Sequence, residues 1–85
     1  MTYRVEIRAA ARKYIKKLPR PQQIRILDAL ASLGNDPYPP ASKRLTNGEA
    51  ERRLRVGDWR ALYDVYDDVL IVDVIRFDSR GQAYK

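Results

Sequence analysis

Two alternating segments joined by a two-residue link constrain the fold of this chain more than any other feature. Residues Arg52–Val56 and Trp59–Tyr66 each alternate between two sets of side chains, and only Gly57-Asp58 separates them. A period of two is typical of a β-strand, and so short a link between two strands is typical of a tight turn. We therefore expect an antiparallel β-hairpin in this part of the chain.

The other periodic segments predict two further strands and two helices. Thr2–Arg8 alternates like a half-buried strand, and Val69–Phe77 is the most apolar segment, which we expect to be the central strand. Ala9–Leu18 and Gln22–Leu33 carry apolar residues at helical spacing, with prolines between them. In the second helix, the expected buried stripe consists of Ile24, Leu27 and Ala31, widened by Leu30 and Leu33.

The resulting order is strand, helix, helix, strand, strand, strand. Two helices joined by a short link form an antiparallel hairpin, and such a hairpin can cover one face of a sheet. We therefore predict an α+β fold in two layers, with the helical hairpin packed on a mostly antiparallel four-stranded sheet. Residues 1–85 are expected to form a single domain, because a chain of this length supports only one modest core.

Strand parity places two arginines on the uncovered face of this sheet. Leu54 and Val56 share one side of their strand and are expected to face the helices, so Arg53 and Arg55 point away from them. Parity alone leaves the face of Arg60 open. If neighbouring strands add further cations, the uncovered face carries a cationic patch.

The composition excludes several classes of chemistry and favours a polyanionic partner. The chain has 85 residues and neither cysteine nor histidine, which rules out disulfides, thiolate metal sites and Ser-His or Cys-His dyads. Its net charge is +6, and residues 1–44 hold ten basic and three acidic residues. Such an excess indicates polyanion binding or, as the alternative, a solubilising surface. No apolar run is long enough for a membrane span or a signal peptide, so we expect a cytoplasmic protein without a membrane partner.

The candidate chemistry is that of arginines and aromatic rings. Isolated glycines form no phosphate-binding loop, and Asp67-Asp68 is interpreted as a turn rather than a metal site. We therefore expect neither a metal nor another cofactor. Guanidinium groups hold phosphates and aromatic rings stack on unpaired bases, a combination that suits single-stranded RNA. Trp59 is interpreted as a packing residue rather than a stacking platform.

Several stretches of the chain resemble segments of one known protein family. Glu51–Tyr63, which reads ERRLRVGDWRALY, resembles the central hairpin of the RelE/ParE toxin superfamily, and Tyr3–Pro19 resembles the first strand and helix of these toxins. Lys43-Arg44-Leu45 is similar to the lysine-leucine step before that hairpin, and Ile75–Lys85 resembles the ending of the RelE-like branch. The resemblance covers essentially the whole chain.

The resemblance implies a type II toxin that cuts messenger RNA in the ribosomal A site and is silenced by a cognate antitoxin in a hetero-oligomer. The catalytic positions of the family correspond to Arg53, Arg55, Arg60, Arg80 and Tyr84. Further contacts with messenger or ribosomal RNA are expected from Lys43, Arg44, Arg76, Arg12 and Lys16. The partners expected are therefore the antitoxin, the ribosome and messenger RNA.

The expected reaction uses the 2′-hydroxyl of the RNA as nucleophile, with guanidinium groups stabilising the negative charge of the transition state. Some relatives have lysines on the hairpin strand, where this chain has Arg53 and Arg55. An arginine does not lose its proton readily, so neither residue can serve as a general base. Asp78 and Ser79 stand where many relatives have a glycine and a histidine. Tyr84 is then the titratable group expected to assist proton transfer.

Two alternatives remain open at this point. One is a ParE-like toxin that inhibits DNA gyrase without catalysis of its own. The other is a catalytically weak relative that binds RNA or antitoxin. The ending with Arg80 and Tyr84 favours the RNA-cleaving branch.

Overall fold

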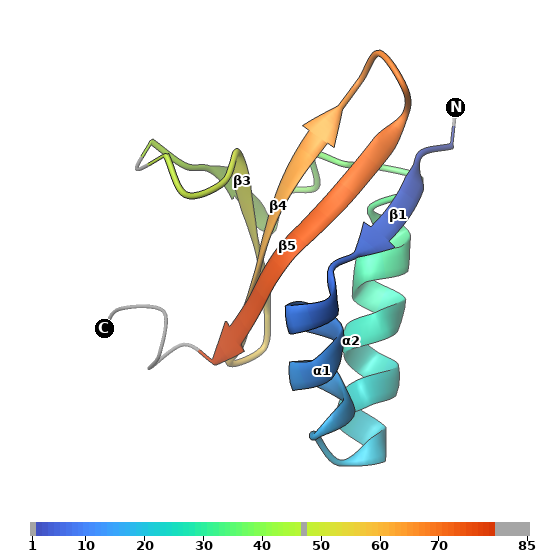
Figure 1. Cartoon of the computed structure of the whole chain (residues 1–85), viewed down its shortest axis with the longest axis vertical. Coiled ribbons are helices and arrows are strands. Elements are labelled where there is room, and N and C mark those ends of the chain that lie inside the picture. The colour runs from blue at the N-terminus through green and yellow to red at the C-terminus, as the bar shows by residue number, and fades with distance from the viewer. Residues whose placement is uncertain (1, 47, 80–85) are drawn as a thin grey trace.

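A computed structural model describes residues 2–46 and 48–79 of the chain (Figure 1). Two helices and five strands follow one another in the order β1, α1, α2, β2, β3, β4, β5. Their bounds are β1 Arg4–Ile7, α1 Ala9–Lys16, α2 Arg20–Ser32, β2 Ser42–Arg44, β3 Arg52–Val56, β4 Trp59–Tyr66 and β5 Ile71–Ser79.

The five strands form one sheet in the order β1-β5-β4-β3-β2, in which β1 and β5 are parallel and all other neighbours are antiparallel. The predicted α+β class and the mostly antiparallel sheet are therefore confirmed, but the predicted number of four strands is wrong. The additional strand, β2, has only three residues and pairs with β3 at the edge of the sheet. Three residues are too few to show the alternation that marks a strand in a sequence, so β2 is recognised only by its pairing with β3.

The most apolar strand, β5, was predicted to be the central strand, and this prediction is wrong. β5 has neighbours on both sides, but β4 is the middle strand of the five. The apolar content of β5 follows from this interior position and from the helix above it, since Val72, Val74 and Phe77 are all buried. Phe77 also meets the ring of Tyr14 of α1 edge-on, with 5.9 Å between the ring centroids.

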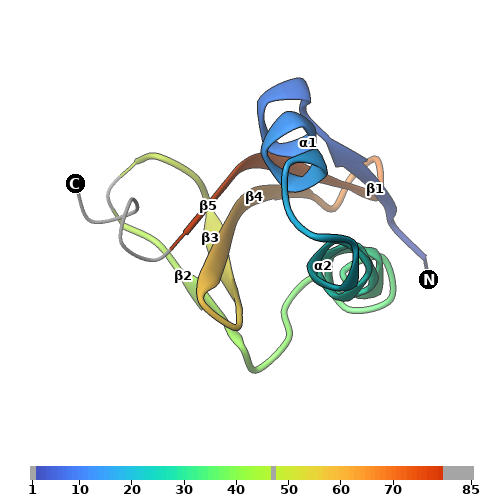
Figure 2. The ribbon, with the colours of Figure 1, turned by 90° about the horizontal axis from the view of Figure 1, so that it is seen from below.

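Both helices lie on the same side of the sheet, and no helix of residues 2–46 and 48–79 covers the opposite side (Figure 2). α1 and α2 run side by side in opposite directions, as the predicted helical hairpin requires (Figure 1). Pro21 lies in the first turn of α2, where its missing N–H has no helical acceptor. Neither helix of the described residues is long and apolar enough to cross a membrane.

The predicted stripe on α2 is largely wrong. Leu30 and Leu33 are fully buried as predicted, but Ile26 completes the buried side. Ile24 and Leu27 remain 52% and 43% exposed. The sequence offers two overlapping series of apolar residues at helical spacing, and only the position of the sheet decides which of them is buried.

The core fills the space between the helical hairpin and the sheet. α1 contributes Ala11 and Ile15, and the three strands β3, β4 and β5 contribute Leu54, Val56, Ala61, Tyr63, Val65, Val72, Val74 and Phe77. The hydroxyl of the buried Tyr63 donates to the carbonyl of Pro37 at 2.7 Å, so no phenol is buried without a partner here. Leu54 and Val56 face the helices as the parity of β3 predicted.

Two tyrosines from distant parts of the chain, Tyr3 and Tyr38, bind Asp67 in the turn after β4. Asp67 accepts hydrogen bonds from Tyr3 at 2.6 Å and from Tyr38 at 2.9 Å, and these bonds lower the pKa of its carboxyl. Burial, followed by the bond to Asp67, raises the pKa of the Tyr38 hydroxyl to about 12. Asp67 and Asp68 lie in a turn, as predicted.

Candidate functional site

The β3–β4 hairpin determines where Arg60 lies. Its two-residue turn, Gly57-Asp58, pairs Val56 with Trp59 and Arg55 with Arg60. Gly57 has φ of 60°, a conformation that favours glycine at the first position of such a turn. Directly paired residues share a face, so Arg60 joins Arg55 on the side away from the helices. The length of the turn was the sequence signal that could have settled this register.

A second row of side chains lies one step further along the same face. Lys43 pairs with Arg53, Arg53 with Leu62, and Leu62 with Arg76. The alternate rows face the helices and are occupied by core residues such as Leu54, Ala61 and Phe77. The side of the sheet away from the helices is called the open face. The row with Arg55 and Arg60 and the row with Lys43, Arg53 and Arg76 together form the cationic half of this face. Its basic residues are Lys43, Arg53, Arg55, Arg60 and Arg76.

These cations differ in their surroundings. Among the residues that the structure describes, Lys43, Arg53 and Arg55 form no ion pair. Arg60 is only 6% exposed, whereas Arg55 is exposed. Arg76 forms ion pairs with Asp78 and with Glu49, the latter at 3.1 Å. Three basic side chains are thus available to an external anion.

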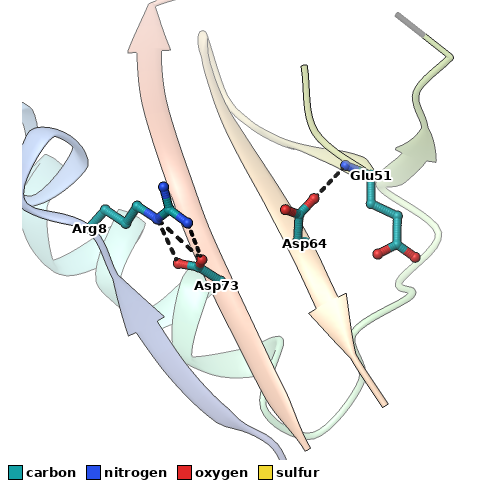
Figure 3. A network of polar contacts seen from close by, with 4 residues as sticks. All are labelled: Arg8, Glu51, Asp64 and Asp73. Atoms are coloured by element: carbon teal, nitrogen blue, oxygen red, sulfur yellow. Dashed lines mark hydrogen bonds and ion pairs between the residues drawn. The ribbon is translucent and has the colours of Figure 1, made fainter. Parts of the chain in front are cut away.

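The other half of the open face carries carboxylates, which we call the anionic half. Glu6, Asp73 and Asp64 are directly paired across β1, β5 and β4. The guanidinium of Arg8 donates to Asp73 at 2.8 Å, and the backbone N–H of Glu51 donates to Asp64 at 2.7 Å (Figure 3). Glu6 forms an ion pair with Arg4 at 3.5 Å. Each carboxylate of this row therefore has a partner within the fold, which offsets the repulsion of like charges on neighbouring strands.

The structure separates several predicted RNA-binding residues from the cationic half. Arg44 pairs with Arg52, so the strand directs it to the other face from Lys43. Arg12 and Lys16 belong to α1 on the helical side. There they border a hollow of about 320 Å³ together with Ile7, Ile15, Gln23 and Leu27. Arg80 and Tyr84 lie outside the described residues.

Arg52, which we did not single out from the sequence, contacts the edge strand β2 and the segment before it. Its guanidinium lies 5.0 Å from the centre of the Tyr38 ring and donates to Ser42 Oγ at 2.9 Å. Trp59 is half-buried and packs against the core, in agreement with its interpretation as a packing residue. Neither residue belongs to the cationic half.

The geometry of the cationic half suits binding of phosphates. No group of three or more histidine, cysteine or acidic side chains within residues 2–46 and 48–79 is placed to hold a metal ion. Guanidinium groups present paired donors that match the oxygens of a phosphate, and they keep their charge at every physiological pH. β3 places Arg53 and Arg55 on one face of the sheet, where a phosphate can reach them, and the 6% exposed Arg60 of β4 lies directly beside Arg55.

Comparisons with known proteins agree with this fold. Residues 5–84 match the sequence profile of the ParE toxin of the type II toxin–antitoxin system parDE. The chain is 30% identical to a candidate toxin, RelE1, of Methanocaldococcus jannaschii, over all of this chain and 98% of that protein.

Two solved structures are similar over nearly their whole length. The archaeal RelE–RelB complex of Pyrococcus horikoshii contains a chain that is 28% identical, with a TM-score of 0.83 over 96% of this chain and 99% of that one. The RelBE2 toxin–antitoxin complex of Mycobacterium tuberculosis contains one that is 27% identical, with a TM-score of 0.80 over 94% of this chain and 100% of that one.

The structure is that of a small two-layer α+β protein with a cationic open sheet face, and the comparisons assign it to a family of toxins. The match over residues 5–84 and the 30% identity to a RelE1 protein make the assignment specific. The chain belongs to the RelE/ParE superfamily, the toxins of type II toxin–antitoxin systems, and is RelE-like.

Proposed function

We propose that this toxin is a ribosome-dependent endoribonuclease that cleaves messenger RNA in the A site and thereby inhibits translation in the cytoplasm. The observation that carries this proposal is the cationic half of the open face. Lys43, Arg53 and Arg55 converge there without an ion pair to any described residue. A cationic strand surface of this kind suits the RNA backbone, whose phosphates contribute most of the affinity.

The proposed reaction is an internal transesterification of the RNA. The 2′-hydroxyl oxygen attacks the adjacent phosphorus, a new O2′–P bond forms, and the P–O5′ bond breaks. Negative charge grows on the nonbridging oxygens of the phosphorane-like transition state. Arg53, Arg55 and Arg60 are proposed to stabilise that charge, because donors already fixed by the strands need no rearrangement during the reaction. The 2′-hydroxyl proton leaves to a base, and the 5′-oxygen receives one.

Proton transfer is assigned to residues other than these arginines. A guanidinium does not give up its proton in a protein, so Arg53 and Arg55 act through charge alone. We propose Tyr84 as the titratable partner and Arg80 as an additional phosphate ligand, on the resemblance of the chain ending to RelE-like toxins. Cleavage then requires neither a metal nor another cofactor.

The test is cleavage in a purified translation system with stalled ribosomes, in which the ends of the messenger RNA are mapped. Wild-type protein is compared with Arg55→Ala and with Tyr84→Phe. Arg4→Ala is the matched control, since Arg4 lies on the same face but at the opposite edge of the sheet. We expect A-site cuts by wild type and by the control, and a loss of at least a hundredfold in Arg55→Ala.

The outcomes separate this proposal from its rivals. Equal cleavage by wild type and Arg55→Ala would show that the cationic half does not act in the reaction. Ribosome binding without cleavage would favour a catalytically weak relative. Absence of cleavage together with inhibition of DNA supercoiling by gyrase would favour the ParE-like alternative, to which the ParE profile match over residues 5–84 gives some weight.

We further propose that a cognate antitoxin binds the helical side of the protein in a hetero-oligomer. The exposed Ile24 and Leu27 of α2 lie on an apolar surface, and the adjoining hollow is bordered by Arg12 and Lys16. This combination fits an amphipathic antitoxin segment whose apolar side chains enter the hollow and whose acidic side chains meet the two cations. The similar chains from Pyrococcus horikoshii and Mycobacterium tuberculosis come from toxin–antitoxin complexes, which supports a partner of this kind.

The antitoxin surface is tested with the antitoxin encoded beside this gene and a charge placed on α2. We expect Ile24→Glu to weaken the complex more than tenfold, because it buries a charge against apolar side chains. Val69→Glu is the control, as Val69 is exposed to a similar degree, 57%, but lies in the turn after β4. Equal binding by Ile24→Glu and wild type would place the antitoxin on another surface.

A further inference from the structure

Two carboxylates, those of Asp78 and Glu49, are bound to the same arginine of the cationic half. Arg76 Nε forms an ion pair with Asp78 on its own strand, and Arg76 Nη1 donates to Glu49 Oε2 at 3.1 Å. Glu49 belongs to the segment between β2 and β3, so its side chain meets an arginine of a strand that is not a neighbour of either. Arg76 is thereby distinguished from Arg53 and Arg55 on the same face.

The geometry of a guanidinium explains why these two ion pairs keep Arg76 from binding an RNA phosphate. A phosphate binds arginine most strongly through two neighbouring N–H donors, and a guanidinium offers two such edges. One edge includes Nε and the other includes Nη1. Asp78 takes a donor on the first edge and Glu49 takes a donor on the second. Neither edge is therefore open to a phosphate while both ion pairs are intact.

The two carboxylates are not equivalent. The Asp78 side chain is 18% exposed and is held within β5, directly opposite Arg60. The Glu49 side chain is 46% exposed, and Arg76 itself is 51% exposed. An exposed ion pair contributes little to stability, so Glu49 is the partner that an incoming anion displaces at low cost.

We propose that Glu49 competes with an RNA phosphate for Arg76, and that Asp78 is a positioning residue that keeps the guanidinium oriented when the exchange takes place. In the free protein the contact with Glu49 is autoinhibitory. When RNA is bound, the edge with Nη1 turns from Glu49 to a phosphate, and the number of cations that contact RNA rises by one. This inference rests on the proposed RNA-binding function of the cationic half.

The experiment measures the affinity of the full chain for a short single-stranded RNA with 2′-O-methyl sugars, which lack the attacking hydroxyl. Titrations over a series of salt concentrations compare wild type, Glu49→Gln, Arg76→Ala and the double variant. The matched control is Glu6→Gln, which makes the same change in charge on the anionic half, where Glu6 is bound to Arg4.

We expect Glu49→Gln to bind more tightly, because Arg76 no longer has a charged competitor. Wild type and Glu49→Gln both make the contact between Arg76 and a phosphate in the complex, so their dependence of log K on log salt should be equally steep. Arg76→Ala loses that contact, and its dependence should be shallower by about 0.7, which is about a fivefold change in affinity per tenfold change in salt. The gain should vanish in the double variant and should not occur in Glu6→Gln. Asp78→Asn tests the positioning role, since it should remove the gain when it is combined with Glu49→Gln.

Three results would contradict the inference. The first is unchanged binding of Glu49→Gln when wild type binds well. The second is an equal gain in the presence and absence of Arg76, and the third is an equal gain in Glu6→Gln, both of which would reduce the effect to net charge. Lack of binding by every protein, wild type included, would instead overturn the proposed function together with the inference.

Discussion

The cationic and anionic halves of the open face share β4 and β5 but differ in how their charges are satisfied. In the anionic half, Asp73 is bound to Arg8, Asp64 to the Glu51 backbone, and Glu6 to Arg4. In the cationic half, Lys43, Arg53 and Arg55 form no ion pair with a described residue. Charges that a fold leaves without internal partners are the ones an external ligand can use, so the difference points to the cationic half as the working surface.

The largest expected effect follows from removing the cations. Replacement of Arg53 and Arg55 by alanine should lower the rate of messenger RNA cleavage, with each lost donor costing about 3 kcal/mol of transition-state stabilisation. The measurement is single-turnover cleavage on stalled ribosomes. Arg8→Ala on the anionic half should leave the rate within a factor of about two. A comparable loss in Arg8→Ala would break the contrast between the halves.

Arg60 sharpens the comparison within the cationic half. It is 6% exposed, whereas its paired residue Arg55 is exposed, so truncation of Arg60 also disturbs buried surroundings. We expect Arg60→Ala to lose cleavage activity and about 1–3 kcal/mol of unfolding free energy in urea. Arg55→Ala should lose activity with almost unchanged stability. Equal stability of the two variants would contradict the distinct role of Arg60.

The pH dependence of stability tests a carboxylate outside both halves, that of Asp67 in the turn after β4. Bonds from Tyr3 and then Tyr38 lower the pKa of Asp67 below its ordinary value of 3.8, so the folded state favours the charged form. The stabilisation is therefore present above that value and is lost as the pH falls through the folded pKa. We expect melting temperatures of wild type to fall more steeply in this acid range than those of Asp67→Asn.

Tyr38, which donates a hydrogen bond to Asp67, makes stability fall as the pH rises in the alkaline range. The pKa of Tyr38 is raised from 10.0 to about 12, so its contribution is complete below pH 10.0 and is lost as the pH rises to about 12. Tyr38→Phe should remove this alkaline component, which thermal melts at a series of pH values can measure. Parallel alkaline melting curves of wild type and Tyr38→Phe would contradict the assignment.

The smallest expected effect belongs to the ion pair between Arg8 and Asp73. Arg8 is more than half exposed, so solvent screens the pair and it should contribute little to stability. A double-mutant cycle with Arg8→Ala and Asp73→Ala measures the coupling free energy. A coupling as large as that of a buried ion pair would show that the anionic half is a structural element in its own right.

The sequence predicted those parts of the fold that depend on local alternation. The period of two in Arg52–Val56 correctly placed Leu54 towards the helices and Arg53 and Arg55 away from them. It failed where two patterns compete, as in α2, in which Ile26 is buried and Ile24 is not. It also failed for β2, whose three residues become a strand only through bonds to β3.

The candidate site was predictable only in part, for a similar reason. The positions of the arginines on the hairpin follow from parity and resemblance, and the two-residue turn adds the register of Arg60. The contact of Glu49 with Arg76 joins residues far apart in the sequence, across a strand that neither belongs to. No spacing or motif signals such a contact, because it depends on how the β2–β3 segment folds.

The most direct test of the working surface is chemical-shift mapping of the isotope-labelled protein with a short single-stranded RNA. The account predicts that shifts concentrate on amides and arginine side chains of β3 and the first half of β4, at Arg53, Arg55 and Arg60, while β1 and the end of β4 stay unchanged. Shifts centred on β1 or on α1 would contradict the account and would place the RNA on another surface of the toxin.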